Sequence, residues 1–181
     1  MLEVLSRLKF EDSKKIDWLP GSRVKMFMAL APDIKAWAVG IDPGRNFGIA
    51  IATKGYVVVY DGSLPQQPEK WKYGVLAIDL VKRIFSGPPQ NFQVGIVEGP
   101  AFNARYGQVS LAEARFGFLY GLIEVGVKDV RVAAPASIRK VVLGGGRYPV
   151  PYETWPRLST NGTDALLALG FALLTMDKSG V

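Results

Sequence analysis

Three acidic residues lie at the ends of segments that are otherwise apolar, and this pattern constrains the fold more than any other feature of the chain. Asp42 ends one apolar segment, Glu98 ends a second, and Asp164 begins a third. A carboxylate at the edge of an apolar segment is unfavourable unless another group compensates its charge. Three converging carboxylates would repel one another, and a divalent metal ion is the usual compensation. Carboxylate oxygens suit magnesium or manganese, ions that assist cleavage of phosphodiester bonds.

The composition removes most other kinds of catalytic site. The chain contains no cysteine and no histidine. It therefore has no thiolate zinc site, no cysteine nucleophile and no histidine general base. The 22 lysines and arginines against 16 aspartates and glutamates give a net charge of +6, which is compatible with a polyanionic partner such as nucleic acid. Carboxylates acting with a metal ion are the simplest remaining chemistry.

Length and hydropathy favour one globular domain. The chain has 181 residues, of which 49% are apolar and 21% charged. No apolar run approaches the roughly 18 to 20 residues that span a bilayer, and the first ten residues lack the apolar stretch of a secretory signal. We therefore expect a soluble protein of the cytoplasm with no membrane partner.

The first 35 residues differ in pattern from the rest. They mix charges of both signs and show little regular spacing beyond Leu2, Leu5 and Leu8, which are placed as on one short amphipathic helix. We expect residues 1–35 to form an N-terminal extension or arm, either as an ordered or partly flexible segment or as an arm that touches a partner or DNA. Residues 36–181 then form the main domain.

From residue 36 the pattern predicts an α/β fold with five strands. Three strands joined by short turns are followed by helices that alternate with two more strands, as parallel strands require. Ligand sites in such sheets lie where strand ends meet. With the first strand central and the fourth beside it, Asp42 and Glu98 become neighbours, and the last helix brings Asp164 to them. The expected strands are 36–42, 47–53, 56–60, 94–98 and 129–133, and the expected helices are 71–85, 110–125, 135–144 and 162–175.

Four stretches, taken in order, carry a family resemblance. They are residues 40–48 (GIDPGRNFG), 97–102 (VEGPAF) with 111–117 (LAEARFG), 134–147 (APASIRKVVLGGGR) and 161–166 (NGTDAL). Together they resemble the RuvC-like Holliday-junction resolvases of the ribonuclease-H-like superfamily. The resemblance implies a ribonuclease-H-like fold with a central mixed five-stranded sheet, three antiparallel strands and then parallel ones, flanked by helices.

The resemblance also implies an activity and a cofactor. It implies a homodimeric, magnesium-dependent endonuclease that cuts a four-way DNA junction, with manganese as an alternative ion. Asp42, Glu98 and Asp164 take the catalytic and metal-ligand positions, and two ions about 4 Å apart are expected. Asn161 stands where the family commonly has a fourth acid or a histidine. Its amide oxygen is neutral and ligates magnesium more weakly than a carboxylate does.

Basic and aromatic residues complete the site that the resemblance implies. Lys140 falls where the family has a basic residue near the scissile phosphate, and Phe102 is placed like the aromatic residue that stacks at the junction. Arg105, Arg139 and Arg147 are further candidate DNA contacts. A helix near residues 110–125 corresponds to the dimer-forming helix, although its small residues suit core packing equally well.

Structural explanations remain open for each acid alone. Asp42 before Pro43 and Gly44 is a common turn former. An edge position or an arginine partner would explain Glu98, and Asp164 suits the first turn of a helix capped by Thr160 or Thr163. Two other functions also remain open: a nucleotide phosphotransferase, for which 181 residues leave no second domain, and a catalytically silent nucleic-acid-binding protein, which Asn161 favours.

Overall fold

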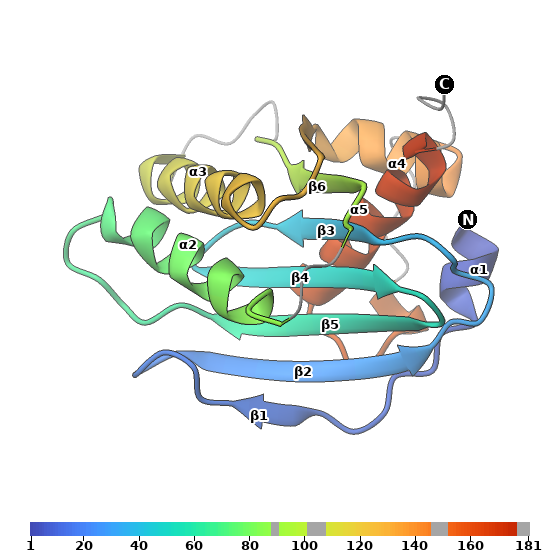
Figure 1. The fold of residues 1–181 in the computed structure, drawn as a ribbon, viewed down its shortest axis with the longest axis horizontal. Helices are drawn as coiled ribbons and strands as arrows, with labels where there is room; N and C mark the ends of the chain where they lie inside the picture. Colours follow the sequence, from blue (N-terminus) through green and yellow to red (C-terminus); the bar gives the residue numbers. More distant parts are fainter. Residues whose placement is uncertain (88–90, 101–107, 146–151, 177–181) are drawn as a thin grey trace.

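The structure is a computed structural model that describes residues 1–87, 91–100, 108–145 and 152–176. One mixed sheet runs through the molecule; its first five strands follow one another in the chain, and a helix precedes each of the last two (Figure 1). In chain order the elements are α1 (Leu2–Ser6), β1 (Lys14–Ile16), β2 (Arg23–Leu30), β3 (Ala38–Asp42), β4 (Asn46–Thr53), β5 (Tyr56–Ser63), α2 (Lys72–Ile84), β6 (Val94–Glu98), α3 (Gln108–Glu124), β7 (Asp129–Ala133), α4 (Pro135–Leu143), the 3-10 turn η1 (Tyr152–Thr154) and α5 (Thr160–Met176).

The sheet has seven described strands in the order β1-β2-β5-β4-β3-β6-β7, so the prediction of five strands was wrong in number. The five predicted strands are present as β3 to β7. β3, β4 and β5 are antiparallel neighbours, whereas β6 pairs with β3 and β7 with β6 in parallel. β1 and β2 extend the sheet beyond β5. Part of the segment 1–35 therefore belongs to the sheet.

β2 was missed because it carries no simple alternation of apolar and polar residues. Val24 belongs to the apolar layer on one face of the sheet, whereas Phe27 and Ala29 belong to the layer on the other face. Exposed charged and apolar side chains separate them, including Arg23, Lys25 and Leu30. A period of two holds only within each half of the strand, and the two halves bury opposite faces.

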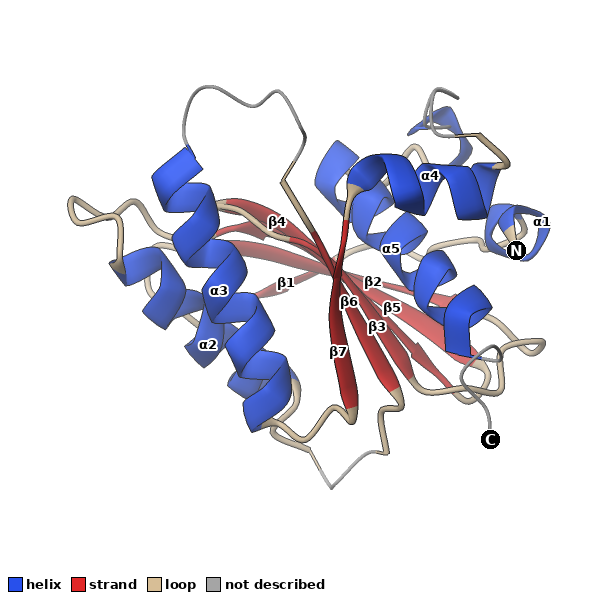
Figure 2. Cartoon of the chain, turned by 90° about the horizontal axis from the view of Figure 1, so that it is seen from above, coloured by secondary structure: helices blue, strands red, loops and turns tan. Residues whose placement is uncertain are grey.

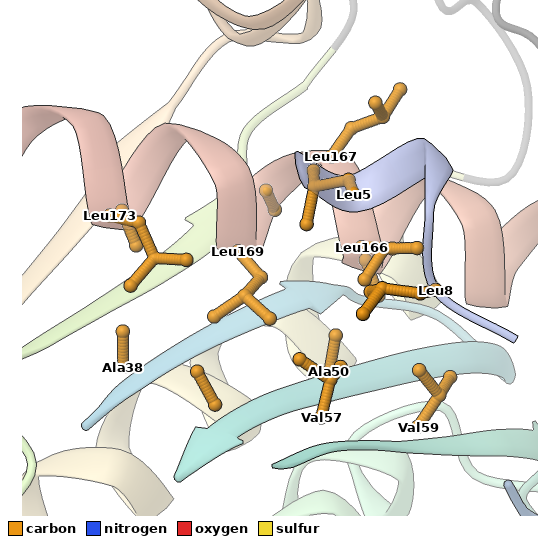
Figure 3. Packing of buried hydrophobic residues seen from close by; sticks show 14 of the residues in the cluster. Leu5, Leu8, Ala38, Ala50, Val57, Val59, Leu166, Leu167, Leu169 and Leu173 are labelled. Atoms are coloured by element: carbon orange, nitrogen blue, oxygen red, sulfur yellow. The ribbon is translucent and has the colours of Figure 1, made fainter. Parts of the chain in front are cut away.

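Helices cover both faces of the sheet (Figure 2). α2 and α3 lie on one face, and α1, α4 and α5 lie on the other. The layer under α5 contains its leucines packed on small residues of β3 and β4 and on valines of β5 (Figure 3). The opposite layer joins β3 and β4 to Phe118 and Leu122 of α3. No helix in the described part of the chain is long and apolar enough to cross a membrane.

The N-terminal helix is fixed to the C-terminal half of the chain. Leu5 is fully buried in the layer under α5. The Trp155 indole Nε1–H donates a buried hydrogen bond of 3.1 Å to the Leu5 carbonyl. Because an indole N–H must find an acceptor when it is buried, this bond anchors α1 beside the segment that leads into α5.

Candidate active site

The first two acids lie side by side at the carboxyl ends of two parallel strands. The register of β3 and β6 pairs Ile41 with Val97, so Asp42 and Glu98 come next to each other at the strand ends. Both side chains are half-buried. The sequence predicted that Asp42 and Glu98 are neighbours, and this follows from the pairing of β6 with the central strand β3.

Two glycines let α5 cross the sheet in backbone contact. A Cβ atom on Gly40 would lie 2.1 Å from the Leu169 backbone nitrogen, and one on Gly48 would lie 2.1 Å from the Asn161 carbonyl oxygen. Neither space admits any side chain, so only glycine permits this approach. The close contact fixes the first turns of α5 against β3 and β4, and thereby fixes the backbone position of Asp164.

The start of α5 is capped through a hydrogen-bond network that reaches the sheet. The Ser159 hydroxyl oxygen accepts from the backbone N–H groups of Asn161 (3.1 Å) and Gly162 (3.3 Å). Asp61 of β5 in turn accepts 2.7 Å hydrogen bonds from both the N–H and the hydroxyl of Ser159. Ser159 is therefore the cap, not Thr160 or Thr163 as the sequence suggested.

The three acids share one electrostatic field. Burial, then the charges of Glu98 and Asp164, raise the pKa of Asp42 from 3.8 to about 8. Burial, then the charge of Asp164, raise the pKa of Glu98 from 4.5 to about 7. Burial also raises the pKa of Asp164. Asp61 adds to the repulsion at Asp42. Each of these shifts disfavours the ionised carboxylate, so the site as folded lacks positive charge.

Two arginines supply part of that positive charge. The Arg115 guanidinium on α3 donates a 3.0 Å hydrogen bond from Nε to the Glu98 carbonyl, and its charge lowers the pKa of both Asp42 and Glu98. Arg139 on α4 acts in the same direction on Glu98 and Asp164. The Tyr152 hydroxyl lies 3.3 Å from an Asp164 carboxylate oxygen and donates a hydrogen bond to it.

Other predicted site residues lie in different places. Lys140 is exposed on α4 next to Arg139. Of these two residues, Arg139 is the one whose charge lowers the pKa of Glu98 and Asp164. Asn161 lies in the first turn of α5, three residues before Asp164 and so on the same side of the helix. Phe102, Arg105 and Arg147 lie outside the described residues.

The side chains do not form a compact metal cage as they stand. Among the described residues, no group of three or more acidic side chains is arranged to hold a metal ion. The backbone positions nevertheless bring Asp42 and Glu98 together, and the mutual charge effects couple them to Asp164. Rotation about the side-chain torsions changes the distances between these carboxylates without any change in fold. The oxygen donors suit a hard divalent cation.

A hollow lies over β2 and β5. It has a volume of about 540 Å³ and is lined by residues of β2, β5 and the start of α5, including Asn161. Asp42, Glu98 and Asp164 are not among the residues that line it. Asn161, which is on the same helix as Asp164, is the residue of the predicted site that lines this groove.

Comparisons with known proteins bear on the fold. No protein-family model matches the sequence, and no curated protein matches it. Chains of solved structures do match it, and two of them are informative about the fold. One is described as Thermus thermophilus RuvC, with a TM-score of 0.56, 17% sequence identity and coverage of 78% of this chain and 96% of that chain. The other is T. thermophilus RuvC in complex with a Holliday junction substrate, with a TM-score of 0.51, 16% identity and coverage of 80% and 97%.

The fold is RuvC-like. The resemblance in the sequence motifs is confirmed at this level in spite of the low identity. The first match leaves 22% of this chain outside the covered part.

Sequence reasoning missed three residues of the acidic neighbourhood: Asp61, Arg115 and Tyr152. Asp61 was assigned to a loop, whereas β5 continues through Asp61 to Ser63. Arg115 lies inside a motif that was recognised, but no spacing rule points its side chain at a strand 17 residues earlier. A charged residue within an otherwise apolar helix face was the only signal for it in the sequence.

Proposed function

We propose that the protein is a metal-dependent, structure-selective DNA endonuclease that resolves four-way junctions by paired phosphodiester cleavage. One observation carries the proposal: the carboxyl ends of β3 and β6 place Asp42 beside Glu98, and α5 brings Asp164 into the same field, within a RuvC-like fold. The neighbour that was solved with a Holliday junction substrate supports branched DNA as the substrate.

Each residue takes a role that its position allows. Asp42, Glu98 and Asp164 would hold magnesium, with Asn161 as a neutral fourth oxygen donor. When bound, magnesium activates a water molecule and stabilises charge on the leaving oxygen. Arg115 holds Glu98 in place through its carbonyl, and Tyr152 orients Asp164. Arg139 acts on both Glu98 and Asp164 and would contact the scissile phosphate, with Lys140 exposed on the same helix.

A homodimer forms part of the proposal. Phe116, Tyr120 and Ile123 follow helical spacing on α3, and each is at least 43% exposed. The rings of Phe116 and Tyr120 stack 6.0 Å apart. The small residues of α3 serve another contact, because a Cβ atom on Gly117 would lie 2.2 Å from the Gly74 carbonyl oxygen of α2. The larger apolar side chains therefore form the surface for a second copy.

The dimer surface has a direct test. We expect the wild-type mass in solution to be that of two chains, and a Phe116→Ser, Tyr120→Ser variant to have the mass of one chain with unchanged helix content. A wild-type protein that stays monomeric at the concentration used for cleavage would contradict this part of the proposal.

The activity is tested on synthetic junctions. We expect the wild-type protein to cut a four-way junction at symmetric positions when magnesium or manganese is present, to leave a linear duplex of the same sequence intact, and to stop when the metal is chelated. Asp42→Asn should remove cleavage and retain junction binding. Failure to bind or cut any branched DNA in either metal would overturn the proposal.

A second candidate function rests on its own observation. The resemblance places Asn161 where an acid or a histidine is common, and the described acidic side chains do not form a compact group of three. Both features suit a protein that binds branched nucleic acid without cutting it. Tight junction binding with no cleavage at any metal concentration would support this second candidate instead.

A further inference from the structure

A row of paired residues connects the acidic site to the edge of the sheet that β1 and β2 form. Across the strands, Asp42 pairs with Gly48, Gly48 with Asp61 and Asp61 with Lys25. Lys25 in turn pairs with Lys15 of β1. Directly paired residues project to the same face of a sheet. Because Asp61 caps the segment before α5, this face is the one that α5 covers.

The outer end of this row is a cluster of cations without partners. Lys15 and Lys25 are exposed and face each other across β1 and β2, an arrangement that destabilises a strand pair unless an anion lies between them. Arg23 is exposed two residues from Lys25 and projects to the same face. Within the described part of the chain, none of the three takes part in an ion pair. Asp61 pairs with Lys25 across the strands but forms no ion pair with it, because both carboxylate oxygens of Asp61 accept hydrogen bonds from Ser159.

These cations line a hollow that is continuous with the start of α5. Arg23 and Lys25 lie in the wall of the 540 Å³ groove, which also contains Asn161 and Arg157. A second hollow of about 370 Å³ shares Arg23 and Lys25 and extends to Lys15. Three acids lie near this path: Asp61 binds Ser159, Asp12 pairs with Arg157, and Asp17 lines the second hollow. The charges of Arg23, Lys25 and Lys15 outweigh the single charge of Asp17, so the path has a net positive charge.

We propose that the outer strands β1 and β2 form a binding track for the phosphate backbone of DNA, in which Arg23, Lys25 and Lys15 contact successive phosphates of one junction arm. The inference rests on the proposed function. Lys25 is three strand spacings from Asp42 and Lys15 is four, or about 14 and 19 Å at about 4.8 Å per strand. Along one strand of a duplex these distances correspond to about four to six phosphates from the phosphate at the acids.

The test compares two variants with the same loss of charge. The track variant is Lys15→Gln, Lys25→Gln. The control is Lys14→Gln, Lys54→Gln, in which Lys14 projects to the opposite face of β1 beside Met26 and Lys54 lies in the turn at the far end of β4. All four lysines are exposed, so neither variant removes a buried contact. Junction binding is measured by fluorescence anisotropy without divalent metal over a range of salt concentrations.

The track variant should lower the slope of log affinity against log salt by about 2, since each phosphate contact contributes about 0.9. That change corresponds to binding about tenfold or more weaker at 0.1 M salt, whereas the control should follow the wild type. A methylphosphonate at the fourth to sixth phosphate from the cleaved one should weaken the wild type and leave the track variant unaffected.

The outcomes separate the track from the activity itself. Equal slopes for the track variant, the control and the wild type, in a protein that still cuts junctions, would overturn the track and leave the proposed function in place. Equal losses in both variants would show a diffuse effect of net charge and would also overturn the track. A wild-type protein that binds no branched DNA would overturn both proposals.

Discussion

Replacement of Asp42 by asparagine should stabilise the protein in the absence of metal. Asp42 is half-buried beside Glu98, Asp164 and Asp61, and burial and these charges raise its pKa from 3.8 to about 8. The folded protein therefore binds a proton at Asp42 that the unfolded chain releases. Between pH 4 and pH 8 the folded state holds more protons than the unfolded state, so stability falls as pH rises through this window.

The size of the effect follows from the shift. Each pKa unit corresponds to about 1.4 kcal/mol, so at pH 7 a shift from 3.8 to about 8 costs the folded state about 4 kcal/mol. Asparagine removes the charge but retains a polar group that must also be desolvated, which costs about 1 to 3 kcal/mol if it finds no partner. We expect a net gain of about 2 kcal/mol, equivalent to roughly 4 to 8 °C in Tm for a chain of this length.

The assay is thermal or urea unfolding with a chelator at pH 5 and pH 8. The free energy of unfolding of the Asp42→Asn variant should exceed that of the wild type by more at pH 8 than at pH 5. Added magnesium should stabilise the wild type more than the variant. Asp33→Asn, at an exposed position, is the control. If Asp42→Asn is no more stable than the wild type at pH 8 while the control is unchanged, Asp42 does not lie among like charges and the reasoning is refuted.

Three further predictions test the scaffold and the site. Gly48→Ala would place a Cβ atom 2.1 Å from the Asn161 carbonyl oxygen, so we expect a loss of about 3 kcal/mol or more in urea unfolding. Thr163→Val should raise stability by about 1 kcal/mol in the same assay, because the Thr163 hydroxyl is buried and has no hydrogen-bond partner among the described residues. Glu98→Gln should keep the circular-dichroism spectrum and junction affinity and abolish cleavage; a lost helix signal would show that Glu98 is structural.

The sequence predicted the centre of the fold because its signals there are local. β3 and β6 are short apolar runs with an acid at the end, and Pro135 and Gly144 mark the two ends of α4. Gly144 has a φ of 86° at the helix end, the conformation that glycine favours. Such features depend on neighbours in the chain and are visible without the structure.

The edge of the sheet and the outer part of the site depend on long-range contacts. β2 becomes a strand because β5 presents a free edge to it, and its pattern shows no period of two along its whole length. The hydrogen bond from Tyr152 to Asp164 depends on the packing of α5 against the sheet. The hydrogen bond from Arg115 to the Glu98 carbonyl depends on the packing of α3. The spacing of residues in the sequence does not predict these contacts.

The charge balance of the site predicts how many ions it binds at rest. Four carboxylates act on one another, from Asp42, Glu98, Asp164 and Asp61, and two guanidinium groups oppose them, from Arg115 and Arg139. With all groups ionised, the site has an excess of two negative charges, which one divalent cation balances. A second cation would add uncompensated positive charge until a DNA phosphate enters. We therefore expect calorimetry to find one magnesium ion per chain without DNA and a second only with a junction bound. Two ions per chain in free protein would show that this balance omits an acidic group.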